Sequence, residues 1–419
     1  MERRSLVVVG LGYVGLPLAV AAVRAGLRVH GLDSDPDRIH GLTQGLSHVD
    51  DISDEEVCEA LDDGFTPTTD ATCVTSADVV VICVPTPLRQ SVPDLDAVCA
   101  AGATVAERLR PGALVVLEST TYPGTTTEIL LPLLERDGSR AVGADFHLAF
   151  SPERIDPGNT SFSLTNTPKV VGGVTEGCTR AAAEFYGSIV DEVVPVSSPA
   201  VAEMTKLLEN TYRQVNIALV NEMSVFCHEL GIDLWEAIDA AATKPFGFKP
   251  FYPGPGVGGH CIPVDPGYLS HRVRTLGYPF RFVELAQEIN NGMPRIVVSR
   301  VTQLLNDNGR SLRGAKVLLL GATYKADISD ERESPCRVAA ERLIAGGAEV
   351  TYHDPHVPSW HIGDRVLNSV PDPAEAAAAA DMTVLLQAHS CYDLDHLVAV
   401  SRLFFDTRGR AAGKQVARL

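Results

Sequence analysis

The stretch Ser5-Leu-Val-Val-Val-Gly-Leu-Gly-Tyr-Val-Gly15 decides the fold of this chain. Its first half is a short apolar run, which predicts a buried parallel strand. The glycine pattern after it predicts a tight turn into a helix that begins at Leu16. A second predicted strand, residues 27–32, ends at Asp33, about 20 residues beyond the glycines. The order of strand, G-x-G-x-x-G, helix, strand and acid is typical of a dinucleotide-binding α/β domain.

The same pattern predicts which cofactor binds. In such a fold the glycines admit a pyrophosphate to the helix N-terminus, and the acid binds the adenosine ribose. Asp33 therefore favours NAD over NADP, because its carboxylate would repel a 2′-phosphate. Arg38 lies nearby in the sequence and weakens this preference.

The composition excludes several classes of partner. The chain has 419 residues, 45% of them hydrophobic, and a formal net charge of −18. That length predicts two or three domains. The charge argues against nucleic acid or a membrane surface as a partner, since both require a basic footprint.

The 9 cysteines are scattered and form no Cys-x-x-Cys pair, so we expect no disulfide framework, no metal site and a reducing cytoplasm. No apolar run is long enough for a membrane span.

Further apolar runs predict strands whose ends carry polar residues. Residues 77–84, 114–118 and 146–150 each read as a buried strand. Ligands of doubly wound sheets bind at the carboxyl ends of the strands. We therefore expect the residues that follow these strands near cofactor or substrate, namely Pro85, Thr86, Ser119, Thr120 and Glu153. The alternative for Glu153 is a surface ion pair.

A long helix is predicted for residues 199–230, because apolar residues recur there at three- and four-residue spacings. Such a helix can cross a whole domain and can serve as a dimer face. Lys206 and Asn210 are four residues apart and share one face of it. They are either functional or an ordinary exposed pair.

Residues 244–268 are too rich in glycine and proline for a helix or a central strand, and they predict a long shaped loop. The aromatic side chains of this loop, Phe246 and Phe248 among them, predict burial rather than disorder. Cys261 lies in its middle and is a candidate nucleophile. A buried structural cysteine is the alternative.

A second doubly wound unit is predicted after residue 312. Its buried strands are expected at residues 316–321, 349–353, 382–386 and 403–406, without a complete glycine fingerprint. The strand-end residues Lys325, Asp327 and Arg332 suggest a site for an anion. The alternative is a domain that only packs.

Three motifs together resemble the nucleotide-sugar 6-dehydrogenases of the UDP-glucose/GDP-mannose dehydrogenase family. They are Gly10-Leu-Gly-Tyr-Val-Gly-Leu16, Gly258-Gly-His-Cys-Ile-Pro-Val-Asp265 and Asp330-Glu-Arg-Glu-Ser-Pro335. The resemblance implies an α/β fold with two doubly wound Rossmann-like domains, joined by a long central helix and a small helical dimerisation region. The expected domains are an NAD-binding domain (1–198), a central helical dimerisation and catalytic-loop domain (199–296) and a nucleotide-sugar-binding domain (312–419).

The resemblance also implies an activity: NAD-dependent oxidation of a sugar C6 hydroxyl to a carboxylate, in two hydride transfers, through a thiohemiacetal and a thioester on cysteine. It assigns catalysis to Cys261, Lys206, Glu153, Asn210, Asp265 and Thr120. It assigns cofactor binding to Gly10, Gly12, Tyr13, Val14, Gly15, Asp33, Arg38, Pro85, Thr86, Ser119, Thr120 and Arg332. It assigns substrate binding to Glu153, Arg154, Lys206, Asn210, Tyr252, Gly258 and Lys325. A homodimer or a larger homo-oligomer is expected.

The expected substrate is inferred from the resemblance of two segments. Residues 151–159 and 243–256 look like those of UDP-N-acetylglucosamine 6-dehydrogenases. UDP-N-acetylmannosamine, UDP-N-acetylgalactosamine and UDP-glucose are the alternative substrates. Two more distant alternatives are a two-electron dehydrogenase, which needs no thiol, and a non-catalytic NAD or nucleotide-sugar binding protein. The latter would tolerate the loss of Cys261, Lys206 or Glu153, and all three are present.

Overall fold

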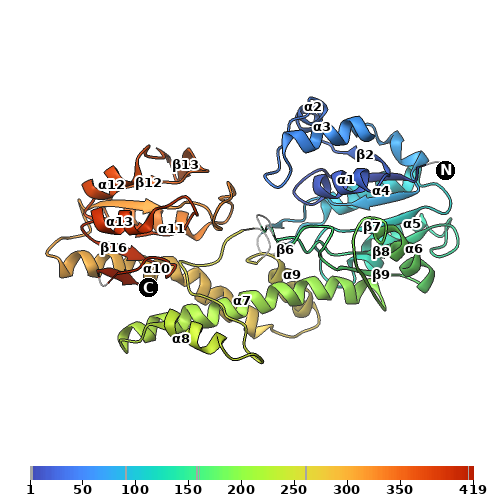
Figure 1. Ribbon diagram of the computed structural model, residues 1–419. Coiled ribbons are helices and arrows are strands. Elements are labelled where there is room, and N and C mark those ends of the chain that lie inside the picture. Colours follow the sequence, from blue (N-terminus) through green and yellow to red (C-terminus); the bar gives the residue numbers. More distant parts are fainter. Residues whose placement is uncertain (1–2, 90–91, 157–158, 160, 260–261, 414) are drawn as a thin grey trace. The chain divides into compact units, whose positions relative to one another are not determined.

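The computed structural model describes residues 3–89, 92–156, 159, 161–259, 262–413 and 415–419 (Figure 1). The chain forms two compact units. The first unit is Met1–Glu209 with Gly267–Tyr278, and the second is Asn210–Pro266 with Pro279–Leu419. Each unit contains its own sheet.

The sheet of the first unit has eight strands, counted over the described residues, in the order β10-β9-β8-β7-β4-β1-β2-β3. All neighbours are parallel except β8 and β9, which are antiparallel. The chain runs outward from β1 to β2 and β3, then returns to β4 on the other side, so the topological switch point lies between β1 and β4. The strands are β1 (Ser5–Val9), β2 (Arg28–Leu32), β3 (Phe65–Thr68), β4 (Val79–Ile82), β7 (Leu114–Leu117), β8 (His147–Phe150), β9 (Lys169–Gly173) and β10 (Val193–Val196).

Both faces of the sheet in the first unit are buried. Leu6 and Val8 of β1 belong to one apolar cluster, and Val7 and Val9 belong to another. This double burial explains why the strand is apolar throughout instead of alternating. Its helical segments are α1 (Gly15–Arg24), α2 (Pro36–Thr43), α3 (Asp54–Asp63), η1 (Ala71–Ser76), α4 (Asp96–Arg108), η2 (Thr126–Leu130), α5 (Leu131–Glu135) and α6 (Glu176–Tyr186), and a short hairpin pairs β5 (Leu88–Arg89) with β6 (Val92–Pro93).

The second unit contains a parallel sheet in the order β12-β11-β15-β16-β17. Its strands are β11 (Lys316–Leu320), β12 (Glu349–His353), β15 (Met382–Leu385), β16 (Phe404–Asp406) and β17 (Val416–Arg418), and a hairpin pairs β13 (Ser359–Ile362) with β14 (Arg365–Asn368). Its helices are α8 (Leu234–Ala242), α10 (Arg281–Asp307), α11 (Pro335–Ala345), α12 (Pro373–Ala379) and α13 (Leu394–Val400).

Two helices include residues of both units. Helix α7 (Pro199–Glu229) begins in the first unit and ends in the second, and α9 (Asp265–Thr275) lies almost wholly in the first. Among the described residues, every helix is too short or too polar to serve as a membrane span. The predicted α/β fold class is confirmed: a Rossmann-like sheet in each unit and a long helical segment between them in the sequence.

Three local features were not predicted from the sequence. Helix α10 runs without a break to Asp307 through Pro294, which is buried together with its neighbour Met293. Burial of that face outweighs the cost of an interior proline. The expected loop over residues 244–268 ends early, because α9 begins at Asp265. Phe246 and Phe248 in that loop are exposed rather than buried.

Candidate active site

The glycine loop after β1 is shaped for a dinucleotide. Gly10 has a φ of 91°, and a Cβ added there would lie 2.8 Å from the Cys83 carbonyl oxygen. A Cβ on Gly15 would lie 1.9 Å from the Gly10 carbonyl oxygen, so the tight turn tolerates no side chain at either position. At Gly12 the Cβ position meets none of the described residues within 4 Å. That open face beside the start of α1 fits the pyrophosphate of NAD.

Asp33 fixes this loop. One carboxylate oxygen accepts hydrogen bonds from the Leu11 amide at 2.8 Å and from Arg38 at 2.8 Å, and the other accepts from the Asp35 amide at 3.0 Å. Burial alone would raise the pKa of Asp33, but these hydrogen bonds and the Arg38 charge outweigh it and lower the pKa. The carboxylate is therefore ionised, and it pairs with the cation that a 2′-phosphate would need. A contact that the sequence did not suggest lies between a His48 ring nitrogen and the Leu11 carbonyl oxygen at 2.8 Å.

The ends of β4 and β7 are tied together. The Thr86 hydroxyl donates to the Thr120 carbonyl oxygen at 2.8 Å, and the Ser119 hydroxyl donates to the Val84 carbonyl oxygen at 2.7 Å. The expected cofactor residues on these two turns therefore do lie together, at the carboxyl edge of the sheet.

Glu203 on α7 holds the turn that follows Thr120. Its carboxylate accepts from the Gly124 amide at 2.6 Å and from the Thr126 amide at 2.9 Å. The side chain is fully buried, and burial raises the pKa of Glu203. This contact orients α7 against the strand ends, and sequence reasoning missed it because Glu203 reads as an ordinary polar helix position.

Glu153, three residues beyond β8, is the centre of the candidate site. The ammonium of Lys206, on α7, donates a hydrogen bond to the Glu153 carbonyl oxygen at 2.6 Å. The Glu153 carboxylate accepts from the amides of Arg154 at 2.7 Å and Ile155 at 2.8 Å. Lys206 and Glu153 are both only 8% exposed. The surface ion pair considered for Glu153 is thus wrong: the carboxylate is buried and held by backbone donors.

A second lysine, Lys169, was missed by the sequence analysis. Its ammonium lies 2.8 Å from one oxygen of Glu153 and 3.0 Å from an oxygen of Glu118. The Tyr186 hydroxyl donates to that same Glu118 oxygen at 2.5 Å. Burial raises the pKa of Glu118, and Lys169 only partly opposes it. At Glu153 burial acts the same way, but Lys169 and the two backbone amides outweigh it and lower the pKa.

The position of Lys169 follows from strand register. In the antiparallel pair, Phe150 of β8 is opposite Gly172 of β9. The same register continued three residues further places Lys169 opposite Glu153. Because β9 runs against β8, the first residue of β9 reaches the edge where β7 and β8 end.

Arg154, expected to bind substrate, is engaged within the first unit. It donates to the Glu209 carboxylate at 2.6 Å and to the Pro168 carbonyl oxygen at 2.7 Å. The expected cofactor residues Tyr13 and Val14 lie in the turn before α1, where Tyr13 is exposed and Val14 half-buried.

In the second unit, Asn210 donates its side-chain amide to the Asp265 carboxylate at 2.5 Å, and both residues are almost fully buried. Cys261, the expected nucleophile, lies outside the described residues. Gly258 lies beside the turn after β11: a Cβ there would approach the Tyr324 Cβ to 2.6 Å. The Gly259 amide donates to the Arg332 carbonyl oxygen at 3.1 Å.

The remaining expected residues of this unit have other surroundings. Arg332 donates through its side chain to Asp330, at 2.9 and 2.7 Å. The Tyr252 hydroxyl donates to Asp239 at 2.7 Å. Lys325 lies in the turn after β11, where the Thr323 hydroxyl donates to the Lys325 carbonyl oxygen at 2.7 Å.

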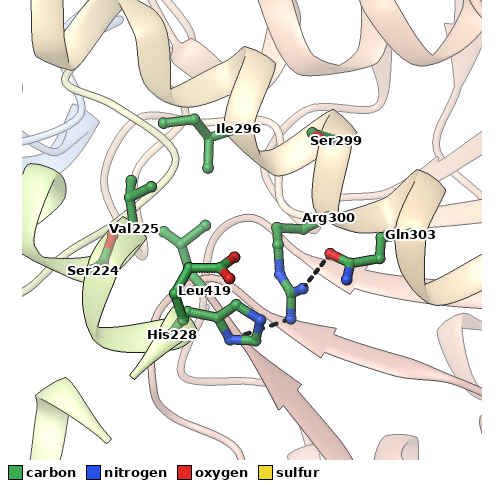
Figure 2. A pocket seen from close by; sticks show the side chains of 9 residues that line it. Ser224, Val225, His228, Ile296, Ser299, Arg300, Gln303 and Leu419 are labelled. Atoms are coloured by element: carbon green, nitrogen blue, oxygen red, sulfur yellow. Dashed lines mark hydrogen bonds between the residues drawn. The ribbon is translucent and has the colours of Figure 1, made fainter. Parts of the chain in front are cut away.

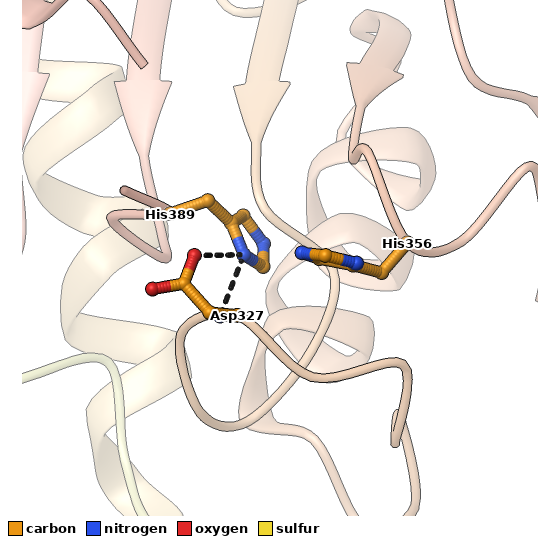
Figure 3. A group of neighbouring side chains, drawn as sticks. All are labelled: Asp327, His356 and His389. Atoms are coloured by element: carbon orange, nitrogen blue, oxygen red, sulfur yellow. Dashed lines mark hydrogen bonds and ion pairs between the residues drawn. The ribbon is translucent and has the colours of Figure 1, made fainter. Parts of the chain in front are cut away.

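Asp327, His356 and His389 form a cluster with the residue types of a metal site (Figure 3). Both ring nitrogens of His389 are already used, however. Nδ1 accepts from the Asp327 amide at 3.0 Å, and Nε2 lies 3.0 Å from the buried Asp354 carboxylate. A metal would have to displace one of these hydrogen bonds, so we read the cluster as a network that fixes the ends of β11, β12 and β15.

A pocket of about 190 Å³ lies between α7, α10 and the end of the chain (Figure 2). Arg300 lies 3.4 Å from a His228 ring nitrogen and donates to Gln303 at 2.6 Å. Burial, then the Arg300 charge, lowers the pKa of His228. The pocket contains none of the expected site residues.

Comparison with known proteins agrees with the motif resemblance. Residues 4–190 match the NAD binding domain of the UDP-glucose/GDP-mannose dehydrogenase family, residues 200–292 match its central domain, and residues 318–412 match its UDP binding domain. A UDP-N-acetyl-D-glucosamine 6-dehydrogenase of Pseudomonas aeruginosa is 35% identical over 93% of this chain and 92% of its own length.

Two further similarities cover nearly the whole chain. An NDP-N-acetyl-D-galactosaminuronic acid dehydrogenase of Ralstonia nicotianae is 35% identical over 100% of this chain and 98% of its own length. The solved structure of a UDP-D-ManNAc dehydrogenase from Pyrococcus horikoshii has a TM-score of 0.88 and 32% identity, and the match covers 99% of this chain and 98% of that one.

Proposed function

Because the chain belongs to the UDP-glucose/GDP-mannose dehydrogenase family, we propose that it oxidises the C6 hydroxyl of UDP-N-acetylglucosamine to the carboxylate in four-electron chemistry. The family makes it an NAD-dependent nucleotide-sugar dehydrogenase. The product of the proposed reaction is UDP-N-acetylglucosaminuronate. NAD, which the glycine loop after β1 and Asp33 would hold, would supply the hydride acceptor for each of the two oxidation steps at C6.

The observation that carries the proposal is the buried pair at the end of β8. The Lys206 ammonium donates a hydrogen bond to the backbone carbonyl oxygen of Glu153 at 2.6 Å. The side chain of the same Glu153 supplies an ionised carboxylate. A fixed cation is suited to the oxygen of C6, where negative charge develops when the hydroxyl proton leaves and again when a thiolate attacks the aldehyde. A fixed carboxylate is suited to take a proton from water.

We assign the remaining roles as follows. Cys261 attacks the aldehyde as a thiolate, and loss of the second hydride from the thiohemiacetal gives a thioester. Water then attacks the thioester carbonyl and gives up one proton to Glu153, and the Cys261 thiolate leaves. Asn210 and Asp265, which are hydrogen-bonded to each other, and Thr120 orient the reacting oxygen and the water. Tyr252, Gly258, Lys325 and Arg154 belong to the proposed substrate site, and Arg332 to the cofactor site.

Replacing the thiol tests this mechanism. Cys261→Ser should stop acid formation and leave NAD binding, measured by cofactor fluorescence quenching, within twofold of the unchanged protein. The alternative of a two-electron dehydrogenase, which needs no thiol, predicts instead that Cys261→Ser retains turnover. Normal acid production by this variant would contradict the thioester route.

The choice of sugar is tested with four substrates in parallel. We expect the highest kcat/KM for UDP-N-acetylglucosamine, compared with UDP-N-acetylmannosamine, UDP-N-acetylgalactosamine and UDP-glucose. Relatives named for mannosamine and galactosaminuronic acid substrates are about as similar to this chain. A clear preference for one of the other three sugars would replace the proposed substrate and keep the reaction.

We also propose that the chain acts as a homodimer or a larger homo-oligomer in a reducing cytoplasm. Helix α7 carries exposed apolar side chains along its length, among them Leu208, which is 63% exposed, and Leu219, which is 53% exposed. Several exposed apolar side chains on one helix are typical of a protein–protein contact. Light scattering at micromolar protein should give at least twice the chain mass of 44.8 kDa; a monomer would contradict the proposal.

A further inference from the structure

We propose that Lys169 is a positioning residue that keeps Glu153 ionised and aimed for proton transfer, with Glu118 as the counter-carboxylate that holds Lys169 in place. This inference rests on the proposed role of Glu153 in thioester hydrolysis. It adds two residues, Lys169 and Glu118, to the machinery of the reaction.

The geometry requires a defined arrangement of charge. Glu118, Lys169 and Glu153 are between 1% and 8% exposed, so none of them is well solvated. Lys169 bridges the two carboxylates at 3.0 and 2.8 Å. A buried carboxylate without a partner takes up a proton, because desolvation disfavours the charged form. Lys169 is thus what allows the Glu153 side chain to remain a base inside the protein.

The two carboxyls on Lys169 are not equivalent. Glu153 accepts from two backbone amides besides Lys169, whereas Glu118 accepts from the Tyr186 hydroxyl and lies 3.7 Å from the Cys83 thiol. The environment therefore lowers the pKa of Glu153 and raises that of Glu118. Two neighbouring acids whose pKa values are driven apart take different roles. Glu153 is the base, and Glu118 anchors the cation.

Among the described residues, the charged and titratable groups that the contacts place around Glu153 are consistent with this assignment. They come from the strand ends and from the two helices packed there, and they are Glu118, Cys83, Lys169, Tyr186, Lys206, Arg154 and Glu209. Lys206 contacts the Glu153 carbonyl oxygen rather than its carboxylate, and Arg154 is paired with Glu209. Lys169 is the cation that the structure places on the Glu153 carboxylate. Burial alone would lower the pKa of Lys169, but the two carboxylates raise it above its usual value, so the ammonium stays charged.

The proton-transfer step is simple. Water gives one proton to the Glu153 carboxylate while its oxygen forms a bond to the thioester carbonyl carbon, and the carbon–sulfur bond to Cys261 breaks. If Glu153 is already protonated, this step stops and the thioester accumulates. The pH at which hydrolysis fails therefore reports the protonation of Glu153.

The test compares the pH dependence of kcat for three variants. Wild type should show no loss on the acid side down to about pH 6, because an ordinary or lowered glutamate pKa lies below that value. Lys169→Met should introduce a new acid limb in the range of about pH 6–8, as expected for a buried carboxyl without a cation. Below this limb kcat should fall about tenfold per pH unit, and it should recover at high pH.

Two control variants separate charge from structure. Lys169→Arg keeps a cation and should keep the wild-type pH profile. Tyr186→Phe removes a hydroxyl from the same buried cluster but keeps the charges of Lys169, Glu118 and Glu153, so it should introduce no acid limb. A fall in kcat by one factor at every pH in Lys169→Met, or the same new limb in Tyr186→Phe, would overturn the proposal.

Folding and mechanism are controlled separately. If Lys169→Met does not fold, Lys169→Met with Glu118→Gln removes one buried carboxylate together with the cation and should show the same acid limb. Intact-mass measurement at pH 6 during turnover should find the sugar thioester on a larger fraction of Lys169→Met than of wild type. If wild type itself forms no thioester when its turnover is quenched rapidly, the proposed function fails. If wild type does form one and Lys169→Met keeps the wild-type profile, only this inference fails.

Discussion

The ammonium of Lys206 lies 2.6 Å from the carbonyl oxygen of Glu153, and this hydrogen bond ties α7 to the end of β8 inside the first unit. A lysine 8% exposed that donates to a backbone oxygen is held in one place. A held cation stabilises charge without reorganising during the reaction. This relationship gives Lys206 its proposed role.

Lys206→Met should therefore lower kcat by about 100- to 1,000-fold with a smaller change in KM, the effect of losing one preorganised donor to an oxyanion. Lys206→Arg keeps the charge and should retain more activity than Lys206→Met. Steady-state kinetics of both variants would check this. A change in KM alone would assign Lys206 to substrate binding.

Asp33→Ala should raise the KM for NAD by about tenfold or more and leave the KM for the sugar nearly unchanged. The variant would lose the charged hydrogen bond that we propose Asp33 makes to the ribose, and it loses the carboxylate that holds the Leu11 amide. Asp37→Ala, at an exposed site on α2, is the matched control. Equal increases in both KM values would remove Asp33 from the ribose site.

Gly258→Ala should destabilise the second unit by about 1–3 kcal/mol, the usual cost of forcing a methyl group into filled space. The new methyl would lie 2.6 Å from the Tyr324 Cβ and 2.8 Å from the Glu333 carbonyl oxygen. Gly292→Ala is the control: it lies in α10, and its Cβ position meets none of the described residues within 4 Å. Urea unfolding should show no loss for that variant, since alanine favours the helix.

Asp354→Asn should cost about 1–3 kcal/mol near neutral pH. The Asp354 carboxylate accepts from the amides of Ala322 and His356 at 2.7 and 2.8 Å and contacts His389. Burial raises its pKa, but these contacts outweigh burial and lower it. A lowered folded-state pKa stabilises the fold above the unfolded value of about 3.9, and this contribution is lost as pH falls through the folded value.

The deficit of Asp354→Asn should therefore shrink as the pH falls below about 4. Urea unfolding at pH 7 and at about pH 3.5 measures it. Asp364→Asn removes an exposed carboxylate from the β13–β14 turn and should change the unfolding free energy little at either pH. A deficit for Asp354→Asn that is the same at both pH values would contradict the charge argument.

The parts of the fold that local signals determine were predictable. The run from Ser5 to Gly15 contains its own strand, turn and helix start, and the structure has β1 and α1 there. The acid at the end of β2 and the polar strand ends were found for the same reason, because the carboxyl edge of a parallel sheet follows from strand direction alone.

What depends on long-range pairing was not predictable. Lys169 begins an apolar run, and only the antiparallel register of β8 and β9 places it opposite Glu153. No pattern in the sequence around Glu203 indicates that its carboxylate accepts a hydrogen bond from the Gly124 amide. The exposure of Phe246 and Phe248 likewise depends on which side chains the rest of the folded chain covers, and their own stretch of sequence does not show this.

The most direct test of the central claim is the yield of NADH per molecule of UDP-N-acetylglucosamine consumed by the unchanged protein. The thioester mechanism predicts two NADH and one uronate for each sugar. A yield of one NADH, with an aldehyde as the product, would contradict it and would leave Cys261 without its proposed role.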